Sequence, residues 1–287
     1  MLSVVIPALN EGDSIAETVR ATVAALSSFL TQYEVIVVDD GSGDLTGENA
    51  ARAGAIVVRH PHNLGYGAAL KAGIRRAKYD VCAILDADLT YPADRLKDLY
   101  AMFSKGYDMV VGARTGKYYN RSINKSVLRT ILGFVVQFTA GRRIPDINSG
   151  LRIFRKDDAV QFFPRLCDTF SFTTSLTLAY MMNGRFVGYV DIPYYERVGS
   201  TKVRLLSDSI RTLEYIVSAA NYYDPLKLFG LFSITCVGLA GIGFLISILS
   251  GIRAGYLLGL GGLLIAIVVF AMGLLASLLK QVMDRLH

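Results

Sequence analysis

The sequence predicts an α/β domain built on a mostly parallel sheet, followed by a pair of membrane-crossing helices. Short apolar runs alternate with helical patterns over residues 1–112, which is typical of βαβ units. Two of these runs end in acidic pairs, Asp39-Asp40 and Asp86-Ala87-Asp88. The chain has 287 residues, 52% of them hydrophobic, and the apolar residues concentrate near its C-terminal end. We therefore expect one domain of ordinary size plus a membrane anchor.

The alternating region predicts five strands and four helices. The strands are the apolar runs at residues 4–6, 35–38, 55–59, 81–85 and 109–112. The helices lie between them, near residues 14–30, 45–53, 68–78 and 93–104. Asp13 or Ser14 is expected to cap the first helix, with Glu17 near its start. Strands in this order form a parallel sheet whose carboxyl ends share one edge.

The pattern changes in the segment 113–145, which contains no acidic residue. Its cations recur at helical spacing: Arg114, Lys117, Arg121, Lys125 and Arg129. Its second half is strongly apolar, and a basic, apolar helix is typical of membrane-surface binding. The alternative is a solvated charged face over ordinary core packing. Residues 203–225 have a similar mixed pattern and are expected to form an amphipathic juxtamembrane helix.

Two uncharged runs, 228–250 and 254–279, predict a transmembrane hairpin over residues 226–280, with a tail at 281–287. Each run exceeds the roughly 20 apolar residues that a spanning helix needs. Buried core helices are the alternative, but helices of that kind normally show a polar stripe.

The distribution of cations predicts the orientation of this hairpin. The loop between the runs carries only Arg253, whereas Lys227, Lys280 and Arg285 flank them. This places both termini and the catalytic domain in the cytoplasm, in a multi-pass protein of the cell membrane. Met1 leads directly into the first expected strand, so we expect no signal peptide.

Charge and cysteine content exclude several other classes of protein. The formal net charge of +6 is too mild to indicate nucleic-acid binding. Cys82, Cys167 and Cys236 are isolated from one another, which predicts neither a zinc site nor a disulfide framework. A reducing cytoplasm fits this pattern.

The acidic strand ends predict a site for a divalent cation and a phosphate-bearing ligand. Two common nucleotide-binding classes fit poorly. The run Gly65-Tyr66-Gly67 lacks the third glycine of a dinucleotide-binding loop and follows the third strand, and no phosphate-binding GxxxxGK[ST] loop is present.

The chain instead resembles family 2 glycosyltransferases of the GT-A fold. Within that family it is most similar to polyprenyl-phosphate glycosyltransferases, the dolichol-phosphate mannose synthase group. The motifs that carry the likeness are VIPALNE at 5–11, VDDGSGD at 38–44, NLGYG at 63–67, DADL at 86–89, GAR at 112–114, NSGLR at 148–152 and RVGSTK at 197–202. The likeness covers about residues 1–225, and we assign residues 1–202 to the GT-A domain.

The resemblance implies a nucleotide-sugar donor and assigns residues to it. Asp88 would ligate Mg²⁺ or Mn²⁺, and Asp86 would contact the metal or the ribose. The residues implied to bind the nucleotide are Pro7, Asn10, Glu11, Asp40, Asp86 and Ala87, with Asp40 accepting a hydrogen bond from the base. Thr90 stands where some relatives have a glutamine that serves the metal, so this ligand is open between Thr90 and water.

The implied acceptor is a polyprenyl or dolichyl phosphate in the lipid bilayer. Because that phosphate is already anionic, cations that orient it matter more than a strong base. The candidates to hold it are Arg114, Arg129, Arg197, Ser200 and Lys202. Asp146 is either a base, a residue that positions the sugar, or a turn residue after Pro145. The catalytic set is thus Asp88, Arg114, Asp146, Arg197 and Lys202.

These expectations combine into inverting, metal-dependent transfer of one hexose from a UDP- or GDP-sugar to a polyprenyl phosphate. Inversion is implied by the resemblance alone. A processive polysaccharide synthase is one alternative, but such enzymes usually carry QxxRW and more spans, and this chain has no tryptophan. The other alternative is a non-catalytic membrane scaffold, against which the intact acidic motifs argue.

Overall fold

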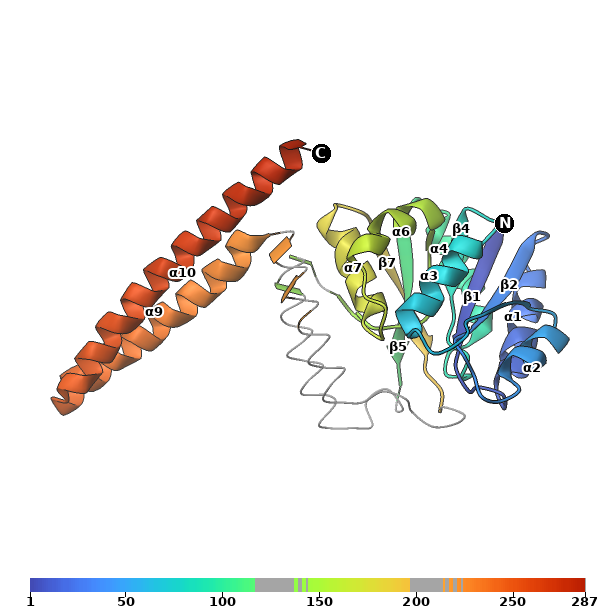
Figure 1. The fold of residues 1–287 in the computed structure, drawn as a ribbon, viewed down its shortest axis with the longest axis horizontal. Coiled ribbons are helices and arrows are strands. Elements are labelled where there is room, and N and C mark those ends of the chain that lie inside the picture. Colours follow the sequence, from blue (N-terminus) through green and yellow to red (C-terminus); the bar gives the residue numbers. More distant parts are fainter. Residues whose placement is uncertain are drawn as a thin grey trace. The chain divides into compact units, whose positions relative to one another are not determined.

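A computed structural model describes residues 1–116, 137–138, 141–142, 144–196, 214, 217–218, 221–222 and 224–286. It divides into two compact units, Met1–Tyr215 and Ile216–His287 (Figure 1). Several residues of the predicted acceptor site and membrane surface lie outside the described residues: Lys117, Arg121, Lys125, Arg129, Arg197, Ser200 and Lys202. The same holds for most of the expected juxtamembrane helix.

The first unit is built on a seven-stranded sheet in the order β3-β2-β1-β4-β6-β5-β7. The strands are β1 Leu2–Ala8, β2 Tyr33–Asp39, β3 Ile56–Arg59, β4 Val81–Ile84, β5 Met109–Thr115, β6 Arg152–Arg155 and β7 Val187–Pro193. All neighbouring pairs are parallel except those of β6, which runs antiparallel to both β4 and β5. The predicted mostly parallel α/β sheet is confirmed, and the five predicted strands are β1 to β5.

The reversed direction of β6 determines where its preceding turn lies. Because β6 is antiparallel, its amino end lies beside the carboxyl end of β4 and the middle of β5, with Arg152 in register with Ile84 and with Val111. The residues just before β6, 146–150, therefore lie at the edge of the sheet where the acidic strand ends also lie.

Helices cover both faces of the sheet. On one face, α1 Ile15–Ser27, α2 Thr46–Arg52 and α4 Leu96–Phe103 contribute to one apolar core. On the other, α3 Tyr66–Arg76, α6 Lys156–Phe162 and α7 Phe172–Met182 contribute to a second. Short 3₁₀ turns, η1 Ala93–Arg95 and η2 Phe163–Arg165, adjoin α4 and α6. Coverage on both faces explains why β1 is buried along its whole length and is apolar except for Ser3.

The start of α1 differs from the prediction in one respect. Ser14 is the N-cap residue, but its side chain makes no capping hydrogen bond. The backbone N–H groups of Ser14 and Ile15 donate instead to the carbonyl of Glu11, at 3.1 and 2.9 Å. Backbone hydrogen bonds to Glu11 thus take the place of the expected side-chain cap at the start of α1.

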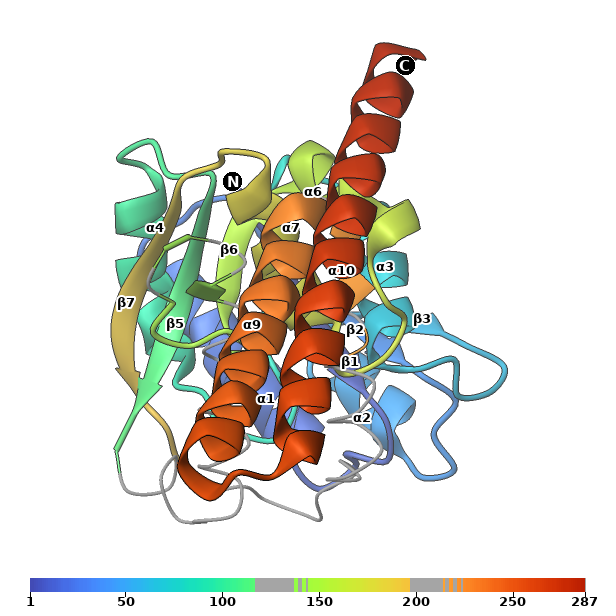
Figure 2. The same cartoon turned by 90° about the vertical axis from the view of Figure 1, so that its left-hand side faces the viewer.

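The second unit contains two long helices, α9 Pro225–Ser250 and α10 Arg253–Leu286, which lie side by side (Figure 2). Asp224 caps α9 by accepting a hydrogen bond from Lys227 N at 3.1 Å, and Pro225 occupies the first helical position. The turn between the helices begins at Gly251, which has φ 68°. The predicted pair of apolar helices is therefore confirmed.

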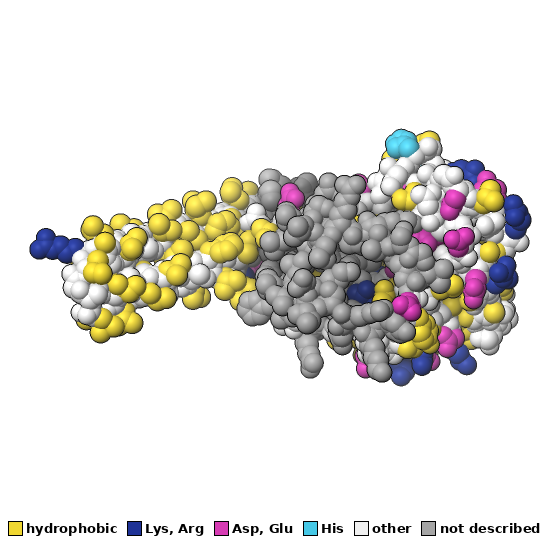
Figure 3. Space-filling view, turned by 90° about the horizontal axis from the view of Figure 1, so that it is seen from below, with side chains coloured by type: hydrophobic (Ala, Val, Ile, Leu, Met, Phe, Trp, Pro, Cys, Tyr) yellow, Lys and Arg dark blue, Asp and Glu magenta, His cyan; other side chains and the backbone are white. Residues whose placement is uncertain are grey.

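Small residues bring the two helices close together. A Cβ added to Gly243 would lie 3.0 Å from the carbonyl oxygen of Gly255, and Ser233 Oγ donates to Ala266 O at 2.9 Å. Many large hydrophobic side chains of both helices are exposed, and they spread over the face seen in Figure 3. Only 11% of the most apolar stretch of each helix is buried within the structure, so these are not core helices, and both are long enough to cross a bilayer.

Candidate active site at the carboxyl edge of the sheet

Asp86 and Asp88 follow β4 at the edge that also receives β1 and β2. Leu85 N still donates to Val5 O at 3.1 Å, and the chain leaves the sheet immediately afterwards. Thr18 of α1 donates its hydroxyl to Ala87 O at 2.9 Å, which anchors the backbone between the two carboxylates. Asp88 is 2% exposed, whereas Asp86 is half-buried.

Thr90 orients the carboxylate of Asp88. Its backbone N–H and its hydroxyl both donate to Asp88 Oδ1, at 3.1 and 2.5 Å. Leu89 between them has φ 60°, so the chain turns tightly enough for this contact. The hydroxyl of Thr90 is thus in contact with the carboxylate that is the predicted metal ligand.

Two residues to which the sequence assigned no role fix Asp86. Tyr66, at the start of α3, donates its hydroxyl to Asp86 Oδ1 at 2.8 Å and stacks on Phe170 at 5.5 Å. Burial, followed by the charge of Asp86, raises the pKa of Tyr66 well above its usual value, so the phenol is a neutral donor. A Cβ on Gly150 would lie 2.2 Å from Asp86 Oδ2, so a larger residue there would displace this carboxylate.

The turn before β6 brings two predicted catalytic residues together. Arg114 holds Asp146 with a two-pronged ion pair, Nε to Oδ2 at 2.7 Å and Nη2 to Oδ1 at 2.9 Å. The backbone N–H groups of Arg114 and Asn148 also donate to this carboxylate. Asp146 is 3% exposed, and its role as a base, a residue that positions the sugar or a turn residue stays a prediction.

The predicted nucleoside pocket is formed by interlocked loops after β1 and β2. Asn10 N donates to Ser42 Oγ at 2.9 Å, and its side-chain oxygen accepts from Gly43 N at 2.8 Å. Glu11 N donates to Thr46 Oγ1 at 2.8 Å. Pro7 is buried within β1. The two loops are therefore preorganised, and the nucleotide contacts assigned to these residues stay predictions.

Asp40 connects β2 to the loop after β3. Its carboxylate accepts hydrogen bonds from Leu64 N at 3.0 Å and Gly65 N at 2.8 Å, and it lies 2.6 Å from His60 Nδ1. It is 3% exposed. Asp40 thus holds this loop in place, and its hydrogen bond to a base stays a prediction.

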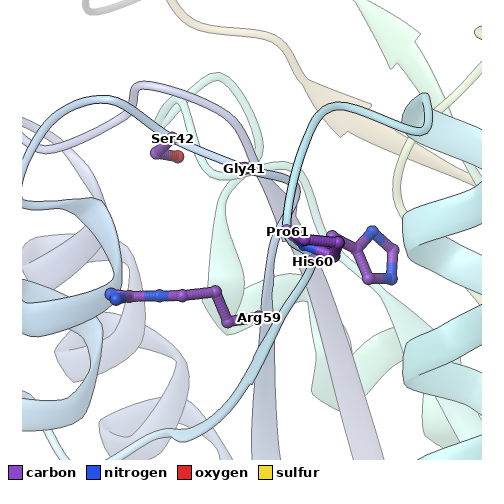
Figure 4. Close-up of a pocket in the computed structure, with 5 residues that line it drawn as sticks. All are labelled: Gly41, Ser42, Arg59, His60 and Pro61. Carbon is purple, nitrogen blue, oxygen red and sulfur yellow. The ribbon is translucent and has the colours of Figure 1, made fainter.

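An open surface hollow lies beside this loop, lined by Gly41, Ser42, Arg59, His60 and Pro61 (Figure 4). Arg59 points toward α2, where it pairs with Glu48 at 2.9 Å, and the His60 ring points the opposite way. The hollow is at the β2–β3 end of the edge, and β1 separates β2 from β4. It therefore borders the predicted nucleoside pocket rather than the paired carboxylates.

The glycines at the start of α3 serve protein packing. The backbone N–H groups of Gly67 and Ala68 donate to Asp168 O at 2.9 and 3.2 Å. A helix start can bind phosphate through such groups, but here they are already paired with a carbonyl. This fits the exclusion of a dinucleotide-binding loop.

Asp86 and Asp88 provide hard oxygen donors of the type that Mg²⁺ and Mn²⁺ prefer. Within the described part of the chain, no three His, Cys, Asp or Glu residues lie together in a way that could hold a metal ion. The carboxylates would therefore share a metal with ligand phosphate and water, as Mg²⁺ sites commonly do.

Solved structures show which fold this is. The glucosyl-3-phosphoglycerate synthase from Mycobacterium tuberculosis in complex with phosphoglyceric acid superposes with a TM-score of 0.62 and 19% identity, covering 77% of this chain and 80% of that one. The same enzyme in complex with Mn²⁺, uridine diphosphate and glucosyl-3-phosphoglycerate gives 0.60 and 19%, with the same coverage. The predicted GT-A fold is confirmed.

Curated relatives match the sequence more closely over a shorter length. The undecaprenyl-phosphate 4-deoxy-4-formamido-L-arabinose transferase of Edwardsiella ictaluri is 38% identical over 160 residues, 54% of this chain and 49% of that protein. The enzyme of the same name from Klebsiella pneumoniae is 34% identical over 185 residues, 59% of this chain and 56% of that protein. The chain spans about half the length of these relatives.

The family model named Glycosyl transferase family 2 matches residues 3–163, which include the carboxylates after β4, the Asp40 loop and the turn before β6. The match covers more than half of the chain. The resemblance found in the motifs is therefore confirmed, and this chain belongs to glycosyl transferase family 2.

Proposed function

We propose that this protein transfers a single hexose from a UDP- or GDP-sugar to a polyprenyl phosphate at the cytoplasmic face of a membrane. The observation that carries the proposal is the pair Asp86 and Asp88, each fixed by its own hydroxyl donor at the edge of a GT-A sheet. The relatives named for undecaprenyl-phosphate transfer support the acceptor class.

On the donor side of the reaction, the negative charge of the leaving group has to be stabilised. As the bond to the sugar breaks, negative charge develops on the departing diphosphate, and a bound divalent cation would offset that charge. Asp88, held by Thr90, and Asp86, held by Tyr66, would carry this cation. Because both carboxylates are fixed before the donor binds, little reorganisation is required at the moment of reaction.

The acceptor side needs orientation more than a base. A phosphate oxygen of the lipid attacks the anomeric carbon, the bond from that carbon to the diphosphate breaks, and the diphosphate leaves with the electron pair. No proton has to be removed because the lipid phosphate is already ionised. An Asp146 that is ion-paired with Arg114 is compatible with this reaction, since no base is needed. Inversion requires the phosphate oxygen to attack the anomeric carbon from the side opposite the leaving group.

Arg129, Arg197, Ser200 and Lys202 are proposed to hold the lipid phosphate, with Arg114 at the end of β5 as a further cation of the site. The two apolar helices would anchor the chain in the bilayer that contains this acceptor. The positive-inside tendency favours a cytoplasmic catalytic domain. A nucleotide-sugar donor would then reach the site from the cytoplasm.

The test is sugar transfer by membranes or detergent-solubilised protein carrying Asp88→Asn. Labelled UDP- and GDP-sugars are supplied with Mg²⁺ or Mn²⁺ and a polyprenyl phosphate, and the extracted lipid is scored for label. We expect a loss of at least about a hundredfold in transfer, because a fixed electrostatic group of the site is removed. Asp94→Asn changes an exposed acid in η1 and is the matched control.

The outcomes separate the three hypotheses. Full transfer by the Asp88→Asn variant contradicts the metal role of this residue. A labelled product that grows into a polymer indicates a processive synthase. No labelled lipid from the unmodified protein with any donor in the panel indicates the scaffold.

A further inference from the structure

Arg152 is a fully buried cation next to the candidate active site. It is the first residue of β6 and directly follows the turn that carries Gly150. Within the described part of the chain, no carboxylate forms an ion pair with it. Its hydrogen bonds go instead to backbone and hydroxyl oxygens: Ser149 O, Thr173 O and Thr177 Oγ1.

A buried charge without a paired carboxylate is costly, so its retention needs a reason. Burial is the largest influence on the pKa of Arg152 and lowers it from its usual value. Two hydrogen bonds to Ser149 O, from Nε at 3.2 Å and from Nη2 at 2.5 Å, offset part of this free-energy cost. This fork fixes one carbonyl in both distance and direction.

The carbonyl that Arg152 holds belongs to the residue before Gly150. Gly150 N donates to Tyr91 Oη at 2.7 Å, so the turn is held from a second side. Gly150 also packs closely on Asp86, since an added Cβ would lie 2.2 Å from its Oδ2. A shift of Ser149 would therefore move Gly150 relative to the carboxylate.

Arg152 also ties this turn to α7. Its Nη1 donates to Thr173 O at 2.9 Å and to Thr177 Oγ1 at 3.0 Å. Thr173 in turn donates its hydroxyl to Asn148 Oδ1 at 2.6 Å. The turn, β6 and α7 thus share one polar network centred on a single guanidinium.

We propose that Arg152 is a positioning residue of the donor site, which sets the place of the Asp86 carboxylate through the Ser149 carbonyl and Gly150. It contacts neither substrate. The proposal rests on the proposed function, in which Asp86 serves the nucleotide diphosphate, and it deepens that function by assigning a residue that determines donor affinity.

The test measures nucleotide binding as well as transfer. Calorimetry with Mn²⁺ and UDP or GDP is performed on the detergent-solubilised full chain carrying Arg152→Gln, Arg152→Lys or Thr177→Val. We expect affinity to fall at least about tenfold for Arg152→Gln, with partial rescue by lysine, because lysine keeps the charge and loses the fork. Thr177→Val keeps Arg152, removes one hydroxyl that accepts from its Nη1, and should give a smaller loss. Arg155→Gln alters an exposed arginine of the same strand, whose side chain lies over the Phe103 ring, and should leave nucleotide affinity unchanged.

A merely structural role predicts a different pattern. The folded fraction would fall while the folded protein bound nucleotide and donor sugar normally, and that result would overturn the proposal. The positioning role predicts a raised KM for the donor with an unchanged KM for the lipid phosphate. It also predicts that Arg152→Gln adds little in an Asp86→Asn background, since both act on one carboxylate. Independent, additive losses would contradict it.

Two controls separate this proposal from the proposed function. If the unmodified protein binds a nucleoside diphosphate but never labels lipid, the acceptor assignment fails and the binding test of Arg152 still decides its role. If Arg152→Gln does not fold, Arg152→Lys and Thr177→Val decide it. If the unmodified protein binds neither UDP nor GDP, the donor assignment and this role are both overturned.

Discussion

Cys82 lies within β4, the strand that leads directly into Asp86 and Asp88, and its side chain is fully buried. Burial raises the pKa of its thiol to about 12. Only the thiolate is a good nucleophile, so we expect Cys82 in the folded protein to resist alkylation at pH 8. Mass spectrometry of the Cys82 peptide after iodoacetamide treatment, with and without denaturant, measures this.

The raised pKa of Cys82 also determines whether the stability of the protein rises or falls with pH. The folded state keeps the thiol protonated, whereas the unfolded chain releases the proton near pH 9. The contribution of Cys82 to stability is therefore complete below about pH 8.5 and declines as the pH rises toward 12. Rapid labelling of Cys82 at pH 8 without denaturant would contradict the buried position of β4.

At the scale of single residues, motif positions predicted the carboxylates better than their partners. Asp86 and Asp88 could be identified because they follow an apolar strand. Tyr66 and Gly150 could not, because their roles depend on contacts across the fold with Asp86. Arg152 belongs to the motif NSGLR, but nothing local in the sequence indicates that this charged residue is fully buried.

The start of α3 provides a prediction at the scale of an element. A Cβ on Gly67 would lie 2.4 Å from Cys167 O, and this carbonyl belongs to backbone that leads into α7. Gly67→Ala should therefore separate α3 from this segment and cost about 1–3 kcal/mol, as overpacking does elsewhere. Denaturant unfolding monitored on the solubilised protein measures the loss.

The control for this variant lies in the same helix. Arg76→Ala changes an exposed residue of α3 and should alter stability by less than about 0.5 kcal/mol. Because Tyr66 is adjacent to Gly67 and holds Asp86, the Gly67→Ala variant should also lose transfer activity. Unchanged stability and activity in Gly67→Ala would show that the two segments are not packed as the structure has them.

Most of the first half of the domain could be predicted because its strands are continuous apolar runs. The predicted run at 81–85 became β4 Val81–Ile84, and the predicted helix near 68–78 became α3 Tyr66–Arg76. The sequence does not predict β6, because this strand begins with the buried Arg152 and pairs antiparallel with strands far away in the sequence. Its antiparallel direction is a long-range property that no local pattern contains.

The molecule combines a polar domain with an apolar hairpin, and glycine serves a different kind of packing in each unit. In the domain, glycine allows backbone to approach backbone or a carboxylate, as at Gly67 and Gly150. In the hairpin, Gly243 and Gly255 allow two helices to approach each other, which is the usual basis of helix packing in lipid. Length and hydropathy of the hairpin could be read from the sequence, whereas the pairing of these glycines could not.

The orientation of the hairpin is the prediction that belongs to the whole molecule. If both termini are cytoplasmic, the turn at Gly251 is on the outer side of the membrane, and Ile252→Cys should react with a membrane-impermeant maleimide in intact cells. Lys97→Cys, an exposed position in α4, should react only after permeabilisation. Labelling is compared with the unmodified chain, whose Cys82 and Cys167 are buried and whose Cys236 lies within α9. The opposite pattern, with Lys97→Cys labelled in intact cells, would put the active site outside. A nucleotide sugar in the cytoplasm could then not be its donor, and the positive-inside tendency would fail for this chain.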